Sequence, residues 1–209
     1  MGRCLTPHKT IKVIVLDFDG TLIDSNRLKS EAFFKLFSDW MTRDIVRAVL
    51  DEMFEASRYE ILAEILARRD HRRHEDCQPE VRSLAAAFND IVVDGAKHCR
   101  EIEDAVEALD FLSSRARLYV SSTTPEAALK EIIAFRGWTD YFVDVFGYPR
   151  KKPETLAGII DREKVENSGV VVVGDGESDR ISAGENRCGF IQVHEAFPLS
   201  EVVWMLGDN

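Results

Sequence analysis

Two segments of the chain are almost entirely apolar and rich in β-branched residues. Residues 12–16 read KVIVL and residues 169–173 read GVVVV, so neither segment alternates between apolar and polar positions. Continuous runs of this kind are typical of strands that are buried on both faces of a parallel sheet. We therefore predict that both segments are interior strands.

Weaker strand and helix patterns alternate in the second half of the chain. Further strands are predicted over residues 117–122, 141–146 and 189–193, and helices over residues 101–113, 125–135, 155–160, 178–185 and 199–206. Since parallel strands are joined through helical crossovers, this order predicts an α/β fold with a doubly wound, mostly parallel sheet. Functional residues of such sheets lie beyond the carboxyl ends of the strands.

Between the first strand and this region, the pattern is helical throughout. Over residues 26–96, apolar side chains recur at spacings of three and four, as in Ala32, Phe33, Leu36 and Phe37. This periodicity is typical of helices that bury one face. The sequence thus predicts an all-helical segment inserted into the α/β fold.

The charge of the chain limits its partners. The 209 residues include 37 acidic and 27 basic side chains, which gives a formal net charge of −10. This excess of acid argues against general nucleic-acid binding, because phosphate contacts need Lys and Arg clustered over a broad face. A single local site can still bind a small anion, above all with a divalent metal in it.

Cysteine usage and hydropathy indicate the compartment. The four cysteines are scattered without the spacing of metal ligands or a disulfide framework, which is typical of a reducing environment. No apolar stretch approaches the roughly 18 residues of a membrane span, and residues 13–16 are too few for the core of a signal peptide. We therefore expect a cytoplasmic protein that makes no membrane contact.

Asp17 and Asp19 follow the first predicted strand directly, in the segment DFDGT. In extended backbone, residues i and i+2 point to the same side, so the two carboxylates are expected to lie close together and repel each other. Such a pair indicates a divalent metal, or a nucleophile beside a general acid. An Asx turn at Asp19-Gly20 would explain the second aspartate but gives no reason for the first.

Three more polar clusters follow strands or begin helices. Ser121 and Ser122 end the second strand, where hydroxyl and N–H groups hold phosphoryl oxygens, although such residues also cap helices. Lys152 precedes Pro153 in a basic stretch that could equally be a solvated loop. Asp175 and Asp179 belong to GDGESD after the strand GVVVV. Asp175 is expected to lie beside Asp17. Asp179 could instead be an acidic residue at the N-terminus of a helix, where the helix dipole stabilises negative charge.

These clusters in this order resemble the four signature motifs of the haloacid dehalogenase-like (HAD) superfamily. DFDGT, the strand ending in VSS, Lys152-Pro153 and GDGESD match the motifs, and DFDGT followed by LIDS is the most specific. The resemblance covers essentially the whole chain. It implies a Rossmann-like core of residues 1–24 and 96–209, interrupted by an all-helical cap domain of residues 25–95.

The resemblance also implies roles for individual residues. Asp17 would be the nucleophile that forms an aspartyl phosphate, and Asp19 the general acid that later acts as a base. The implied binding residues are Asp17, the backbone carbonyl of Asp19 and Asp175 for Mg²⁺, Ser121 and Lys152 for the phosphoryl group, Ser122 through its backbone N–H, and Asp179 as a support for Lys152 or a metal-bound water.

We therefore expect a Mg²⁺-dependent phosphatase that acts on a small phosphorylated metabolite. A phosphoglucomutase-like phosphoryl transferase of the same superfamily and a non-catalytic phosphate-binding scaffold are the alternatives. A haloacid dehalogenase is disfavoured, because by resemblance those enzymes lack the second carboxylate that Asp19 provides. Arg58 in the predicted cap could reach an anionic group of the substrate, or could be a solvated helix residue. The basic run at residues 68–74 is interpreted as a helix end that complements its dipole.

Overall fold

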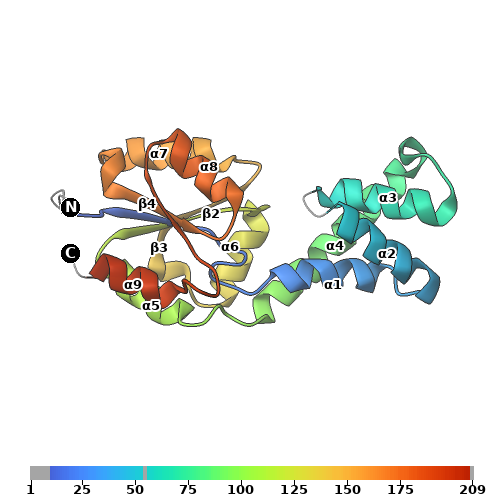
Figure 1. Cartoon of the computed structure of the whole chain (residues 1–209), viewed down its shortest axis with the longest axis horizontal. Coiled ribbons are helices and arrows are strands. Elements are labelled where there is room, and N and C mark those ends of the chain that lie inside the picture. The colour runs from blue at the N-terminus through green and yellow to red at the C-terminus, as the bar shows by residue number, and fades with distance from the viewer. Residues whose placement is uncertain (1–9, 54–55, 208–209) are drawn as a thin grey trace, which may run out of the picture. The chain divides into compact units, whose positions relative to one another are not determined.

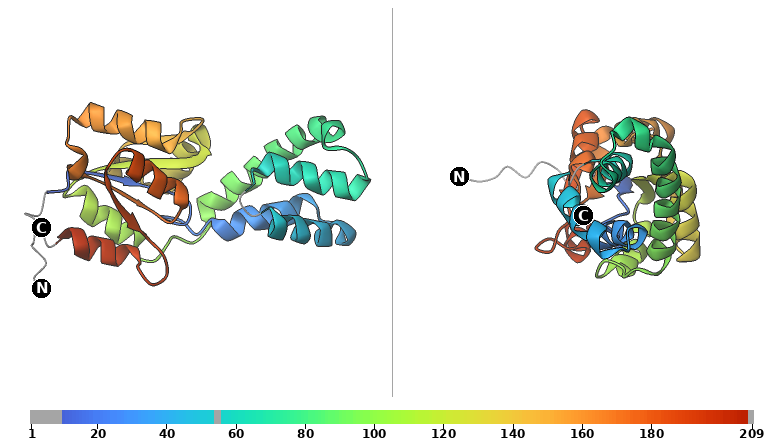
Figure 2. Two further views of the ribbon diagram at one scale, coloured as in Figure 1. Left: turned by 45° about the horizontal axis from the view of Figure 1, so that its top comes forward. Right: turned by 90° about the vertical axis from the view of Figure 1, so that its right-hand side faces the viewer.

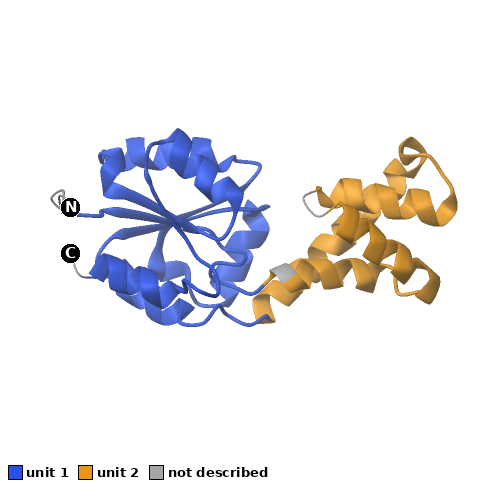
Figure 3. Cartoon of the chain, in the orientation of Figure 1, with its two compact units in different colours: residues 1–24, 99–209 blue, residues 25–98 orange. Residues whose placement is uncertain are grey.

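The computed structural model describes residues 10–53 and 56–207. It consists of two compact units, one formed by residues 1–24 with 99–209 and the other by residues 25–98 (Figure 3). We call the first the α/β unit and the second the helical unit. The chain therefore leaves the α/β unit after its first strand and returns to it about seventy residues later.

The α/β unit is built on a five-stranded sheet in which all neighbouring strands are parallel. The strands are β1 (Val13–Leu16), β2 (Arg117–Pro125), β3 (Phe142–Tyr148), β4 (Val170–Gly174) and β5 (Gly189–Gln192), and they lie in the order β3-β2-β1-β4-β5. Every residue of β1 and β4 is buried, because helices cover both faces of these central strands. The predicted α/β fold with a doubly wound parallel sheet is confirmed.

Helices cover the sheet in two layers (Figures 1 and 2). One face carries α7 (Lys152–Glu163) and α8 (Glu177–Glu185), and the other carries α5 (Ala105–Ser113), α6 (Glu126–Phe135) and α9 (Leu199–Gly207). Successive side chains of a strand point to opposite faces of the sheet. Val13 and Val15 of β1 accordingly share one face, where they pack with Leu156 and Ile159 of α7.

The strand order places a topological switch between β1 and β4. From β1 the chain winds outward to β2 and β3, then crosses back to β4 and β5 on the other side. Leu16 pairs with Val120 of β2 and with Val173 of β4. The residues that follow these three partners are therefore neighbours at the carboxyl edge of the sheet, where ligands bind in folds of this kind.

The described residues of the helical unit form four α-helices and one short 3₁₀ helix. These are α1 (Asn26–Leu36), α2 (Trp40–Glu52), α3 (Arg58–Asp70), η1 (His74–Cys77) and α4 (Gln78–His98). Phe33 and Phe88 anchor its core, with ring centroids 4.6 Å apart. Ser57 and Glu60 form a capping box that begins α3. Across the described residues, no helix is long and apolar enough to cross a membrane.

The basic run at residues 68–74 stabilises the end of α3. Arg68 pairs with Glu52 at 2.6 Å and with Glu64 at 2.6 Å. Arg69 pairs with Glu80 of α4 at 3.1 Å. Because these guanidinium groups are engaged by carboxylates of the same unit, the run ties α3 to its neighbouring helices, in line with its interpretation as a helix end.

Candidate active site

Asp17, Lys152 and Asp179 form a buried ionic group at the carboxyl edge of the sheet. Asp17 follows β1, and its backbone N–H donates to the carbonyl of Val173 at 2.9 Å. Lys152 is the first residue of α7, and its Nζ lies 2.9 Å from Oδ1 of Asp17 and 2.8 Å from Oδ1 of Asp179. Lys152 is only 6 % exposed and Asp179 only 1 %. One ammonium group therefore bridges two carboxylates away from bulk water.

This burial shifts the proton affinities of the group. Burial raises the pKa of Asp17 to about 7, Lys152 opposes the rise, and Asp179 and Asp19 add to it. Burial also raises the pKa of Asp179, against the opposing charge of Lys152. For Lys152, burial lowers the pKa, but Asp17 and Asp179 outweigh it and raise the pKa overall. Lys152 thus remains positively charged, but its one charge does not balance the negative charge of the carboxylates around it.

Asp17, Asp175 and Asp179 can together hold a cation. Each offers a carboxylate oxygen, and these three oxygens all lie within 4.8 Å of one another. Oδ2 of Asp179 is buried and has no hydrogen-bond partner among the described residues, a costly state that a bound cation would relieve. Hard divalent cations such as Mg²⁺ prefer such oxygen ligands. The residues present therefore fit a divalent metal.

Gly174 is what allows Asp179 to approach this group. It ends β4, and a Cβ atom built on it would lie 2.4 Å from Cγ of Asp179 and 2.6 Å from its Oδ2. No side chain can occupy that space while Asp179 keeps its place. The glycine in GDGESD thus makes room for the first turn of α8, which carries Asp179 back toward Lys152.

Asp19 is not one of the three clustered carboxylates, although it is close enough to raise the pKa of Asp17. A tight turn after Asp17 has Gly20 at a φ of 74°, and the N–H of Leu22 donates to the carbonyl of Phe18 at 2.9 Å. The Asp19 carboxylate is instead held by hydroxyl groups of β2. Oδ2 accepts a hydrogen bond from Oγ1 of Thr124 at 2.6 Å and a longer one from Oγ of Ser122 at 3.4 Å.

The serine and threonine cluster belongs to β2 rather than to a helix cap. β2 continues to Pro125, beyond the predicted end at residue 122, and α6 begins at Glu126 without a side-chain capping bond. The helix-cap alternative is therefore wrong. Ser121 is buried and follows the residue that pairs with Leu16, which places it beside Asp17. Thr124, which was not predicted as a site residue from the sequence, lies on the same side of β2 as Ser122.

Arg58 is the one predicted site residue in the helical unit. It begins α3, and its guanidinium carbon lies 5.3 Å from the ring centroid of Tyr59. Its Nε is buried and lacks a hydrogen-bond partner among the described residues. The other predicted residues all belong to the α/β unit.

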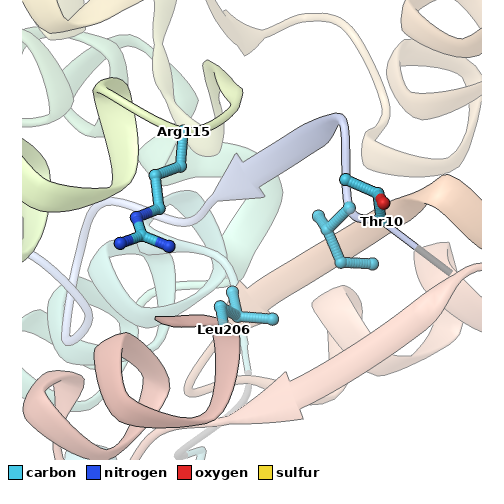
Figure 4. Close-up of a pocket in the computed structure, with 4 residues that line it drawn as sticks. Thr10, Arg115 and Leu206 are labelled. Carbon is cyan, nitrogen blue, oxygen red and sulfur yellow. The ribbon is translucent and has the colours of Figure 1, made fainter. Parts of the chain in front are cut away.

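A separate hollow of about 270 Å³ lies at the opposite edge of the sheet. Thr10 and Ile11 precede β1, Arg115 precedes β2, and Leu206 of α9 completes the lining (Figure 4). Among the described residues that line it, none carries a carboxylate, and the only nucleophile is the hydroxyl of Thr10. Since the acidic cluster lies at the carboxyl ends of the strands, this hollow takes no part in its chemistry.

Comparisons with known proteins agree with this geometry. The sequence model of the haloacid dehalogenase-like hydrolases matches residues 11–186. The chain is 26 % identical over 193 residues to the phosphoglycolate phosphatase of Vibrio vulnificus, covering 87 % of this chain and 82 % of the relative.

Solved structures show the same fold. A HAD-superfamily hydrolase of subfamily IA from Geobacter sulfurreducens superposes with a TM-score of 0.69 at 19 % identity, covering 94 % of this chain and 97 % of its own. A haloacid dehalogenase-like family protein from Streptococcus pneumoniae gives a TM-score of 0.66 at 17 % identity, covering 94 % and 90 %. Because the family match spans most of the sequence, the chain belongs to the haloacid dehalogenase-like hydrolase family and is an enzyme of that family.

Proposed function

We propose that this enzyme is a Mg²⁺-dependent phosphatase that hydrolyses a small phosphorylated metabolite through an aspartyl phosphate on Asp17. The observation that carries the proposal is the buried group in which Lys152 bridges Asp17 and Asp179 beside Asp175. A carboxylate at this place can attack phosphorus, while an ammonium group and a metal can compensate the charge of the phosphoryl oxygens. The family match supports hydrolysis as the reaction type.

In the first step, a carboxylate oxygen of Asp17 forms a bond to phosphorus while the bond from phosphorus to the ester oxygen breaks. The electron pair of that bond goes to the leaving oxygen, which takes a proton from Asp19. Lys152, Ser121 and the backbone N–H of Ser122 would hold the phosphoryl oxygens. Mg²⁺, held by Asp17, the backbone carbonyl of Asp19 and Asp175, would supply positive charge against the developing negative charge.

In the second step, water hydrolyses the aspartyl phosphate. Asp19, now ionised, removes a proton from the water as its oxygen bonds to phosphorus, and the acyl phosphate bond returns its electron pair to Asp17. Ester and water have then become alcohol and inorganic phosphate, and both aspartates regain their starting states. Asp179 would keep Lys152 in place through both steps, because their contact of 2.8 Å is buried.

The helical unit is proposed to act as the cap domain that selects the substrate. Arg58 would contact a second anionic group of that substrate, which its unpartnered and buried Nε supports. The curated relative from Vibrio vulnificus is named a phosphoglycolate phosphatase, and so 2-phosphoglycolate is the first compound to test. A cytoplasmic location is also proposed, because the three cysteines that the structure describes, Cys77, Cys99 and Cys188, form no disulfide with one another.

A phosphate-release screen tests the function. The purified chain would be assayed with 2-phosphoglycolate, sugar phosphates, nucleotides and phosphoserine, each with Mg²⁺ and with EDTA. We expect Mg²⁺-dependent release of inorganic phosphate, and loss of turnover in Asp17→Asn with an unchanged circular dichroism spectrum. Interconversion of sugar phosphate isomers without phosphate release would indicate the phosphoglucomutase-like alternative. Binding without turnover of any ester would indicate a scaffold, and full activity of Asp17→Asn would refute the nucleophile.

A further inference from the structure

We propose that Thr124 is a positioning residue that holds the carboxyl group of Asp19 for proton transfer to the leaving group. Its Oγ1 lies 2.6 Å from Oδ2 of Asp19, the shorter of the two hydroxyl contacts to that oxygen. This inference rests on the proposed phosphatase function, in which Asp19 is the general acid. It adds a residue that no sequence motif of the chain indicates.

The contact belongs to a closed network of hydrogen bonds. The backbone N–H of Thr124 donates to Oγ of Ser122 at 3.0 Å, and that hydroxyl in turn lies 3.4 Å from Oδ2 of Asp19. Thr124 therefore reaches the carboxylate directly through its side chain and indirectly through Ser122. The direct contact is much the shorter of the two, 2.6 Å against 3.4 Å, so it dominates.

The local backbone is shaped to bring Thr124 to this position. The hydroxyl groups of Ser122 and Thr124 both reach Oδ2 of Asp19, so these two side chains lie on the same side of β2. The pairing of β2 with β3 shifts its register between Ser121 and Pro125. A Cβ atom at Gly147 of β3 would lie only 2.4 Å from the carbonyl oxygen of Thr124. The segment thus packs tightly against β3, which fixes the place from which the hydroxyl group donates.

The placement of two hydroxyl donors has a chemical consequence. Both donate to Oδ2 of Asp19, so the proton that Asp19 passes to the leaving oxygen is carried on Oδ1. Without the Thr124 hydroxyl, the carboxyl group can rotate about its bond to Cβ, and the proton is less often aligned with the leaving oxygen. Such misalignment slows departure of a basic leaving group without removing the nucleophile or the phosphoryl contacts.

The test compares leaving groups of different basicity. Values of kcat/KM, which report the first phosphoryl transfer, would be measured with phenyl phosphate and p-nitrophenyl phosphate in saturating Mg²⁺. Phenolate is the more basic leaving group and depends more on the proton from Asp19. We expect Thr124→Val to lower kcat/KM about tenfold for phenyl phosphate and no more than about threefold for p-nitrophenyl phosphate.

Two variants serve as controls. Thr124→Ser keeps the hydroxyl group and should restore both values to within about twofold of the wild type. Thr123→Val makes the same change at the exposed neighbouring residue and should leave both values within about twofold. Circular dichroism would verify folding, and Thr124→Ala would replace Thr124→Val if the latter failed to fold.

The outcomes separate this role from the proposed function. Equal losses with both esters, or no recovery in Thr124→Ser, would show that Thr124 is only structural. Failure of the wild type to hydrolyse either ester would overturn the phosphatase proposal and the positioning role together. A loss confined to phenyl phosphate, reversed by Thr124→Ser, would support the positioning role.

Discussion

Replacing Asp17 with asparagine should stabilise the metal-free enzyme at alkaline pH, although it removes the proposed nucleophile. Burial raises the pKa of this carboxyl group from 3.8 to about 7 in the folded chain. Between those values the folded state binds more protons than the unfolded state, so the stability of the wild type falls as the pH rises through this interval. The loss is absent below pH 3.8 and complete above about pH 7.

The size of the effect follows from the shift. A rise of about three pKa units corresponds to roughly 4 kcal/mol lost at pH 8 when the group is ionised. Asparagine carries no charge in either state and avoids this loss, while Lys152 keeps its 2.8 Å contact with Asp179. The rise in pKa is already net of the attraction by Lys152, so we expect the variant to be more stable by up to about 4 kcal/mol at pH 8. This advantage should shrink by about 1 kcal/mol at pH 6, where the wild-type carboxyl group is mostly protonated.

The stability of both proteins would be measured by urea denaturation in EDTA at pH 6 and pH 8. Both pH values lie above the isoelectric point of about 5.0, so the chain has a net negative charge at each. Asp161→Asn, at an exposed carboxyl group of α7, is the matched control and should show no such pH-dependent gain. An Asp17→Asn variant that is less stable than the wild type at pH 8 would refute the reasoning. So would an advantage of equal size at both pH values.

Two further predictions concern the residues around Asp17. Mg²⁺ should raise the melting temperature of the wild type at pH 8 when it is titrated into the metal-free protein. Asp175→Asn should raise the Mg²⁺ concentration at the midpoint of that titration at least about tenfold. An unchanged midpoint would remove Asp175 from the metal ligands. Gly174→Ala should cost about 1–3 kcal/mol in urea denaturation, because its Cβ would collide with Asp179. Gly184→Ala in α8 is its control. It has no atom within 4 Å of the added Cβ and should be neutral or stabilising, so similar losses at both glycines would contradict the packing argument.

The sheet could be predicted from the sequence because its central strands must be apolar. With both faces covered by helices, β1 and β4 have no solvent-facing position, and their residues are accordingly Val, Ile and Leu apart from the terminal glycine of β4. The polar residues directly after these strands then mark the carboxyl edge of the sheet. The position of a residue at this edge, as for Asp17 and Asp175, could therefore be predicted from the end of a strand, while its role stays a prediction.

The partners of Asp19 could not be predicted in the same way. Strand alternation suggests that Ser122 and Thr124 share a side, but only if β2 continues past residue 122, and Pro125 argued for a helix start instead. In the structure β2 continues to Pro125, its register shifts against β3 beyond Ser121, and the carbonyl oxygen of Thr124 closely approaches Gly147. These features depend on backbone packing between strands, for which the pattern of apolar residues gives no signal.

The excess of acidic side chains in the chain bears directly on how this site could bind an anionic substrate. Three carboxylates, those of Asp17, Asp175 and Asp179, cluster beside the single ammonium group of Lys152, and burial of Asp17 and Asp179 weakens the screening that water would provide. A phosphate dianion entering such a place would be repelled unless further positive charge were present. On the proposed function, a divalent cation therefore has two tasks: it stabilises the clustered carboxylates, and with Lys152 it reverses the local sign so that an acidic protein can bind an anionic substrate.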